Sequence, residues 1–309
     1  MGRLRALPSV AERSRAGRPR PREHDRVACG MTEAAPYQTS GGLRTEAVAA
    51  IRDATSLTPE VALILGSGLG PLADEIEVDA ELGYDDIPGF ATSSAPGHAG
   101  RLVLGTLDGR PVVAMRGRLH PYDGIPAARV AFPVRVMHAL GAERLLVSNA
   151  CGGLDPHWRA GDLMLQLDLI NFTFENPLIG PNDPEVGPRF PVMFDAYDPA
   201  YLELVRRTAR HLDVPLREGV YLAVSGPNYA SRAELRMFRS WGADAIGMST
   251  VFEVLAARHE GMRVVGLSTV TDLAIADRDH HADGDEVLRV AAASGATFRR
   301  LVRAVVPQL

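Results

Sequence analysis

The sequence contains no lysine, so all 33 of its basic residues are arginines. This absence excludes chemistry that needs a lysine amine, such as Schiff-base formation or phosphate binding by a P-loop lysine. The two cysteines, Cys29 and Cys151, are too few for a disulfide framework and lack the spacing of metal ligands. We therefore expect neither a disulfide scaffold nor a structural metal site.

Long apolar runs are also missing. No segment approaches the roughly 18 to 20 apolar residues of a membrane-spanning helix, and the beginning of the chain has no apolar core of a secretory signal. The 309 residues, of which 46% are hydrophobic, carry a net charge of −5, as in many globular proteins. We expect a cytoplasmic protein without a membrane partner.

Residues 1–40 are rich in arginine, proline, glycine and serine and show no helical or strand periodicity. We predict a disordered extension here and a folded domain over residues 41–309, with Met31 as a natural start for the folded part. A nucleic-acid-binding or targeting role for this basic arm is the alternative. We favour an extension without function and expect no nucleic-acid partner.

From Leu43 onward, short apolar runs alternate with amphipathic stretches, which is typical of an α/β domain. Two of these runs are joined by Asp108-Gly109, a tight turn that requires antiparallel pairing, so we predict a mixed sheet. No repeat or long linker divides the sequence, which favours one domain with a mixed central β-sheet flanked by helices. The predicted strands are 61–65, 101–107, 111–116, 145–148, 163–169, 221–224, 245–247 and 264–270, and the predicted helices are 45–53, 127–140, 199–212, 232–241, 251–259 and 284–305.

A glycine-rich loop, Gly66-Ser67-Gly68-Leu69-Gly70, directly follows the first predicted strand. Glycines let backbone N–H groups approach an anion closely, and Ser67 adds a hydroxyl donor. A dinucleotide fingerprint would need a small residue in place of Pro71 and an acidic residue at the end of a second strand. We favour an anion site, with dinucleotide binding and a simple tight turn as alternatives.

Two further loops carry histidines beside predicted strands. His98 precedes strand 101–107, and Arg118 and His120 follow strand 111–116. The guanidinium of Arg118 is planar and permanently charged, which suits phosphate oxygens, and a nearby histidine adds a donor. Taken singly, a structural histidine and a solvated surface arginine are the alternatives.

Small and polar residues end several other strands. The backbone around Ala150 is open, Ser249 precedes a predicted helix whose N-terminus attracts anions, and Asp272 places a carboxyl group after an apolar strand. Ligands of α/β sheets bind at the carboxyl ends of strands, although Ser249 as a plain helix N-cap is an alternative. We find no Ser/His/Asp-type nucleophile and no metal cluster in the sequence, which favours a reaction in which phosphate itself is the nucleophile.

Taken together and in this order, these segments resemble the trimeric purine nucleoside phosphorylases and their methylthioadenosine phosphorylase relatives over residues 43–309. The resemblance implies that phosphate displaces the purine at the anomeric carbon through a ribosyl cation-like transition state. It implies a homotrimer and no cofactor, with inorganic phosphate as co-substrate and a purine nucleoside as the other partner. It assigns the phosphate site to Ser67, His98, Arg118, His120, the Ala150 backbone N–H and Ser249.

The resemblance also assigns contacts to the nucleoside. Tyr122 and Met248 would contact the ribose, Tyr229 would stack on the base, and Asp272 would address N7 and the 6-position. His120 and Asp272 are the implied catalytic residues.

Two more contacts are implied less directly. Family members borrow an aromatic residue from the neighbouring subunit, for which Phe172 or Phe174 is the candidate, with packing inside its own subunit as an equal alternative. His280 or His281 is a candidate for the 5′ end of the sugar, near Gly284, with solvent-exposed histidines as the alternative.

Two positions depart from family members that act on inosine and guanosine. Ala230 stands where those enzymes usually carry Glu, and Asp272 where they carry Asn. The missing Glu removes an acceptor for N1–H of a 6-oxopurine, and a carboxylate facing O6 is repulsive. A carboxyl group can instead accept from a 6-amino group and, when protonated, donate to N7. We predict a preference for adenosine, with methylthioadenosine phosphorolysis or an inosine and guanosine preference as alternatives and a nucleosidase or nucleotide-binding protein as remote ones.

Overall fold

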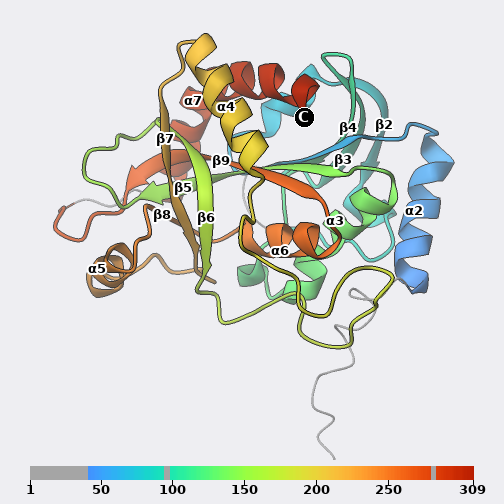
Figure 1. Cartoon of the computed structure of the whole chain (residues 1–309), viewed down its shortest axis with the longest axis horizontal. Coiled ribbons are helices and arrows are strands. Elements are labelled where there is room, and N and C mark those ends of the chain that lie inside the picture. The colour runs from blue at the N-terminus through green and yellow to red at the C-terminus, as the bar shows by residue number, and fades with distance from the viewer. Residues whose placement is uncertain (1–40, 94–97, 280–282) are drawn as a thin grey trace, which may run out of the picture. The chain divides into compact units, whose positions relative to one another are not determined.

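The strands in the described part of the chain form one mixed sheet in the order β2-β3-β4-β1-β5-β8-β7-β6-β9 (Figure 1). The computed structural model describes residues 41–93, 98–279 and 283–309, so the predicted extension over residues 1–40 and the candidates His280 and His281 lie outside it. The prediction of a mixed sheet with flanking helices is confirmed. The strands are β1 Val61–Leu65, β2 Glu77–Gly83, β3 Arg101–Leu107, β4 Arg110–Arg116, β5 Arg144–Gly153, β6 Leu163–Asn171, β7 Leu216–Ala223, β8 Ala245–Gly247 and β9 Arg263–Leu273.

β5 links two parts of this sheet. It pairs in parallel with β1 and β9 and antiparallel with β8, while β9 also pairs with β6. Because β6 pairs with β7 and β7 with β8, the strands β5, β8, β7, β6 and β9 close into a ring. A register shift after Cys151 sets Gly152 opposite Asp272. The ring thus brings the ends of β5, β8 and β9 to one place.

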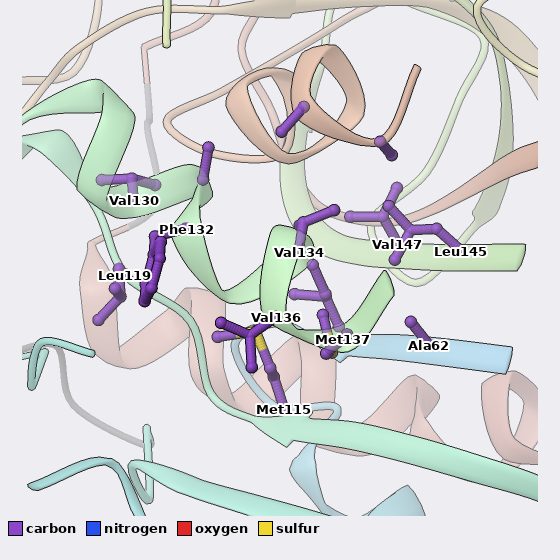
Figure 2. Close-up of a cluster of buried hydrophobic side chains, with 14 of the residues drawn as sticks. Ala62, Met115, Leu119, Val130, Phe132, Val134, Val136, Met137, Leu145 and Val147 are labelled. Carbon is purple, nitrogen blue, oxygen red and sulfur yellow. The ribbon is translucent and has the colours of Figure 1, made fainter. Parts of the chain in front are cut away.

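Both faces of the central strands are buried, which explains their continuous apolar sequences. Along β1, Ala62 and Ile64 face one cluster of buried side chains, and Val61, Leu63 and Leu65 face another. Figure 2 shows part of the first cluster, in which Ala62 lies with Met115 and with side chains of α3. The first cluster includes residues of α2, α3 and α6, and the second includes residues of α4 and α7. The helices are α2 Gly42–Ala54, α3 Ala127–Ala139, α4 Pro199–His211, α5 Arg232–Ser240, α6 Val251–His259 and α7 Gly284–Val305, with short 3-10 helices at Gly70–Glu75, Tyr84–Asp86, Pro121–Asp123 and Val306–Gln308.

The sequence prediction omitted β2, which pairs antiparallel with β3 at an edge of the sheet. This strand carries Glu77, Asp79 and Glu81 and is largely exposed, so it lacks the apolar alternation that identifies a strand. Charged side chains on an edge strand discourage pairing with other chains. Among the helices of the described residues, none has the length and apolar character needed to cross a membrane.

Candidate active site

One pocket gathers nearly all of the predicted site residues. The parallel strands β4, β1, β5 and β9 end at the same edge of the sheet, and β8 meets β5 there at Gly152 and Ile246. The predicted residues that line the pocket are Ser67, Arg118, His120, Tyr122, Ala150, Tyr229, Ala230, Met248, Ser249 and Asp272.

Two glycines let the loops of this pocket approach one another. A Cβ on Gly66 would lie 2.7 Å from the Ser148 carbonyl oxygen, so the loop after β1 packs directly on the backbone of β5. Gly117 has a φ of +98°, and a Cβ there would lie 2.8 Å from the Cβ of His98. Larger residues at these positions would separate the phosphate-site candidates, which is a physical reason for glycine.

The guanidinium of Arg118 is fully buried at the floor of the pocket, with 1% of its surface exposed. Its Nε donates to the Glu253 carboxylate at 2.9 Å, and its Nη1 donates to the Ser148 carbonyl oxygen at 2.6 Å and to the hydroxyls of Ser249 and Thr250. Its buried Nη2 has no hydrogen-bond partner among the described residues. The alternative of a solvated surface arginine is therefore wrong. Arg118 is a buried cation of the pocket wall, and its Nη2 makes no hydrogen bond to the described residues.

His98 lies beside the pocket and contacts Ser67, which lines it. Its Nδ1 accepts a hydrogen bond from the Arg118 backbone N–H at 2.6 Å, and its Nε2 lies 3.2 Å from the Ser67 hydroxyl. Burial and the Arg118 charge lower the pKa of His98 to about 4, so its ring is neutral at pH 7. Because a backbone N–H can only donate, the ring proton belongs on Nε2 and points to Ser67. The Ser67 oxygen then accepts, which leaves the hydroxyl proton for an anion.

His120 connects the phosphate-site candidates with the ribose-site candidates. Its ring packs edge-on against His98 at 5.1 Å and stacks on Tyr122 at 4.5 Å. Burial, helped by the two neighbouring basic side chains, keeps the pKa of His120 well below its usual value. Its buried Nδ1 has no hydrogen-bond partner within the described ranges. A neutral imidazole with one nitrogen available can accept from or donate to a ligand, depending on its tautomer.

Part of the pocket wall is apolar, as expected for a surface that packs against a purine ring. Ala230 lies among Val224, Leu235 and Ile246 on the pocket wall. Position 230 therefore carries a methyl group, where a Glu carboxylate is expected of 6-oxopurine enzymes. Tyr229, which is 47% exposed, forms part of the rim. The pKa of Tyr229 is raised by burial and by the Asp272 carboxylate, so the two side chains are electrostatic neighbours.

Ser249 lies two residues before the first residue of α6, as predicted. The N-cap position itself is taken by Thr250, and no side chain caps the helix. The alternative of Ser249 as a plain N-cap is therefore wrong. Its hydroxyl instead faces Arg118 and the pocket, beside the positive end of the helix dipole.

Comparison with known proteins shows the family of this chain. The family model described as the phosphorylase superfamily matches residues 60–307. The chain belongs to this superfamily. It is 51% identical to purine nucleoside phosphorylase 1 of Bacillus subtilis, over 85% of this chain and 97% of that protein. It is 48% identical to the purine nucleoside phosphorylase of Bos taurus, over 76% of this chain and 83% of that one.

Solved structures of phosphorylases give the same result. The Schistosoma mansoni purine nucleoside phosphorylase in complex with adenosine matches with a TM-score of 0.82 and 37% identity, over 86% of this chain and 96% of that one. A schistosoma purine nucleoside phosphorylase in complex with hypoxanthine matches with a TM-score of 0.81 and 36% identity, over the same shares of both chains. The predicted fold and resemblance are confirmed, and with them the enzyme class, a pentosyltransferase of the purine nucleoside phosphorylase type.

Sequence reasoning assigned no role to Glu253 and Thr250, which do not line the pocket themselves but contact its Arg118. Both contact the Arg118 guanidinium, from positions more than 130 residues later in the chain. A buried arginine requires a partner of opposite charge, but the sequence offers many carboxylates and does not indicate which one is near. Only the packing of α6 against β5 and β9 identifies it.

Proposed function

We propose that this enzyme catalyses the reversible phosphorolysis of purine ribonucleosides and deoxyribonucleosides, with a preference for 6-aminopurines such as adenosine. The observation that carries the proposal is the buried Arg118 guanidinium, whose Nη2 has no hydrogen-bond partner among the described residues, in a pocket that Ala230 and Asp272 also line. A fixed cation and an apolar wall with a carboxyl group suit phosphate and a purine, respectively.

The proposed phosphate site offers several donors to one anion. Ser67 and Ser249 supply hydroxyl groups, Arg118 supplies Nη2, and His120 and the Ala150 backbone N–H complete the proposed site. His98 contributes through Ser67, whose hydroxyl it orients. Donors fixed in advance cost no reorganisation when the anion binds, which makes them effective in a buried site. Phosphate is thus the co-substrate, and the proposed reaction uses no cofactor.

The proposed reaction is a single displacement at the anomeric carbon. A phosphate oxygen forms a bond to C1′ while the bond from C1′ to purine N9 breaks and its electron pair leaves with the base. The bound phosphate stabilises positive charge on the ribosyl group, and His120 keeps that phosphate in place. Asp272 addresses N7 and the 6-position of the base as it leaves. Tyr122 and Met248 would hold the ribose, and Tyr229 would stack on the purine.

The proposed base preference rests on Ala230 and Asp272. Ala230 gives the pocket wall a methyl group, so N1–H of a 6-oxopurine would meet no acceptor from this residue. Asp272 can accept from a 6-amino group, whereas its carboxylate repels O6. Relatives were solved with adenosine and with hypoxanthine, so the preference of this chain depends on its own residues.

Phosphorolysis of adenosine, inosine, guanosine and methylthioadenosine, compared side by side, tests the proposal. We expect kcat/KM to be highest for a 6-aminopurine nucleoside, by about tenfold or more, since one unmatched buried polar group costs 1–3 kcal/mol. Release of free base without phosphate would indicate a nucleosidase instead. A tenfold preference for inosine would contradict the base assignment but not phosphorolysis.

We also propose a homotrimer in which Phe174 reaches the neighbouring subunit. Phe172 packs inside its own subunit, with ring centroids 5.2 Å from Phe238 and 5.3 Å from Trp241. Phe174 is 84% exposed at a φ of +60°. Other large apolar side chains are exposed along the same segment, which favours a contact with a second copy of the chain. They are Ile179, Phe190, Val192 and Phe194.

Phe174→Ala is expected to raise KM for the nucleoside about three- to tenfold, the value of one aromatic contact, with little loss of stability. Phe172→Ala is the matched variant and should lower the free energy of unfolding instead, because its ring packs in a cluster. Steady-state kinetics, thermal melting and light scattering measure these effects and the assembly mass. A monomeric wild-type enzyme, or an unchanged KM for Phe174→Ala, would contradict this assignment.

A further inference from the structure

We propose that Glu253 is a positioning residue for phosphate: it holds the Arg118 guanidinium so that Nη2 stays available to the anion. Glu253 has no proposed contact with either substrate, and it acts through Arg118 alone. The inference rests on the phosphate site proposed above and adds to it the residue that fixes its cation.

The contact between the two side chains is short and shielded from water. Arg118 Nε lies 2.9 Å from Glu253 Oε1, and the side chains are 1% and 4% exposed, respectively. A buried ion pair gains little net stability, because the desolvation of both charges offsets their attraction. What the pair does provide is a fixed orientation of a planar group.

The guanidinium is held at two of its three nitrogens. Glu253 accepts from Nε, and the Ser148 carbonyl oxygen accepts from Nη1 at 2.6 Å. In a rigid plane, two fixed nitrogens determine where the third one points. Without the Nε contact, the group can rotate about its Nη1 hydrogen bond, and Nη2 loses its fixed direction.

The backbone at the beginning of α6 supplies a second, independent observation. Thr250 has a φ of +75°, an uncommon conformation for a β-branched residue. Its side chain does not cap the helix, and its hydroxyl lies 3.2 Å from Arg118 Nη1. This turn brings Ser249, Thr250 and Glu253 to the same guanidinium. Strained conformations persist where their surroundings require them, often at binding sites.

The negative charge of Glu253 contributes to the stability of this arrangement, whereas its acceptor oxygen sets the direction of the guanidinium. Arg118 lies beside the N-terminal turn of α6, where the helix dipole is positive, so an unpaired guanidinium there would be repelled. Glu253 belongs to that first turn and offsets both positive charges.

Positioning and charge make opposite predictions for Glu253→Gln and Glu253→Asp, and Glu253→Ala sets the size of the effect. Glu253→Ala removes the acceptor and should raise KM for inorganic phosphate about tenfold or more, the effect of one charge-assisted hydrogen bond, with a much smaller change in kcat and in KM for adenosine. Glu253→Gln keeps an acceptor oxygen and should recover most of this loss. Glu253→Asp keeps the charge but is one methylene shorter, so it should resemble Glu253→Ala.

Glu260→Ala is the matched control. Glu260 is also a buried carboxylate that pairs with an arginine, Arg135, at 2.8 Å, but neither lines the pocket. This variant should lose thermal stability without a selective rise in KM for phosphate. Kinetics with inorganic phosphate varied, together with melting curves, distinguish the two kinds of effect.

Two results would overturn the inference. One is a folded Glu253→Ala enzyme with the wild-type KM for phosphate. The other is a raised KM for phosphate in Glu253→Gln together with an unchanged one in Glu253→Asp. Phosphate binding would then depend on the charge of residue 253 and not on the position of its acceptor oxygen. If Arg118→Met also left the KM for phosphate unchanged, the proposed phosphate site itself would fail.

Discussion

Arg118→Met is expected to lower kcat/KM for phosphate by about 10³-fold or more, since it removes a fixed donor and the permanent charge that binds the anion. The same change leaves Glu253 as a buried carboxylate without its cation, which should cost about 3–5 kcal/mol of unfolding free energy. Steady-state kinetics with phosphate varied and denaturant unfolding measure the two effects separately.

The double variant Arg118→Met/Glu253→Gln separates catalysis from folding. Because both buried charges are removed, it should regain much of the lost stability but none of the lost activity. Arg135→Met serves as a control, since it breaks a buried ion pair with Glu260 that does not line the pocket. It should be destabilised while its KM for phosphate stays near the wild-type value. An Arg118→Met enzyme with wild-type kinetics would refute the assigned phosphate site.

Ala230→Glu combined with Asp272→Asn should shift the ratio of kcat/KM for inosine over adenosine by about 10²-fold or more toward inosine. The new Glu provides an acceptor for N1–H of hypoxanthine and opposes the lone pair at N1 of adenine. The new Asn can donate to O6 through its amide, whereas the carboxylate repels it. Parallel assays of both nucleosides at saturating phosphate give the ratio directly.

Asp272→Asn alone should move the ratio part of the way in the same direction. Tyr229→Phe is the control, because a stacking ring does not distinguish a 6-amino from a 6-oxo group, and it should change both substrates by a similar factor. An active double variant whose ratio equals that of the wild type would show that other groups in the pocket select the base.

Much of the proposed site could be predicted from the sequence because its residues follow strands directly. Ser67, Arg118 and Ser249 each come within three residues of a strand end, and strands with buried faces are readily identified by their apolar runs. Parallel strands bring such positions to one edge of the sheet. Local pattern and a general rule of α/β folds indicate these positions, and the family resemblance assigns them to phosphate.

Other features depend on contacts that no local pattern encodes. The polar edge strand β2 was missed because its exposed residues show no apolar alternation. β7 begins five residues before the predicted 221–224, because its first residues are largely polar and do not look like a buried strand. The Arg118–Glu253 pair joins residues 135 positions apart in the chain. The proton position on His98 follows from one backbone N–H, that of Arg118 in the neighbouring loop, which only coordinates can reveal.

The ring formed by β5, β8, β7, β6 and β9 affects how the enzyme melts when it is loaded with substrate. β5 belongs both to this ring and to the open part of the sheet, and its end lines the pocket at Ala150. A ligand in the proposed site would contact residues that follow strands of both parts, so neither part could open without releasing it. Binding energy therefore adds to the cooperativity of unfolding, and saturation at 100 times Kd raises the unfolding free energy of the whole sheet by about 2.7 kcal/mol.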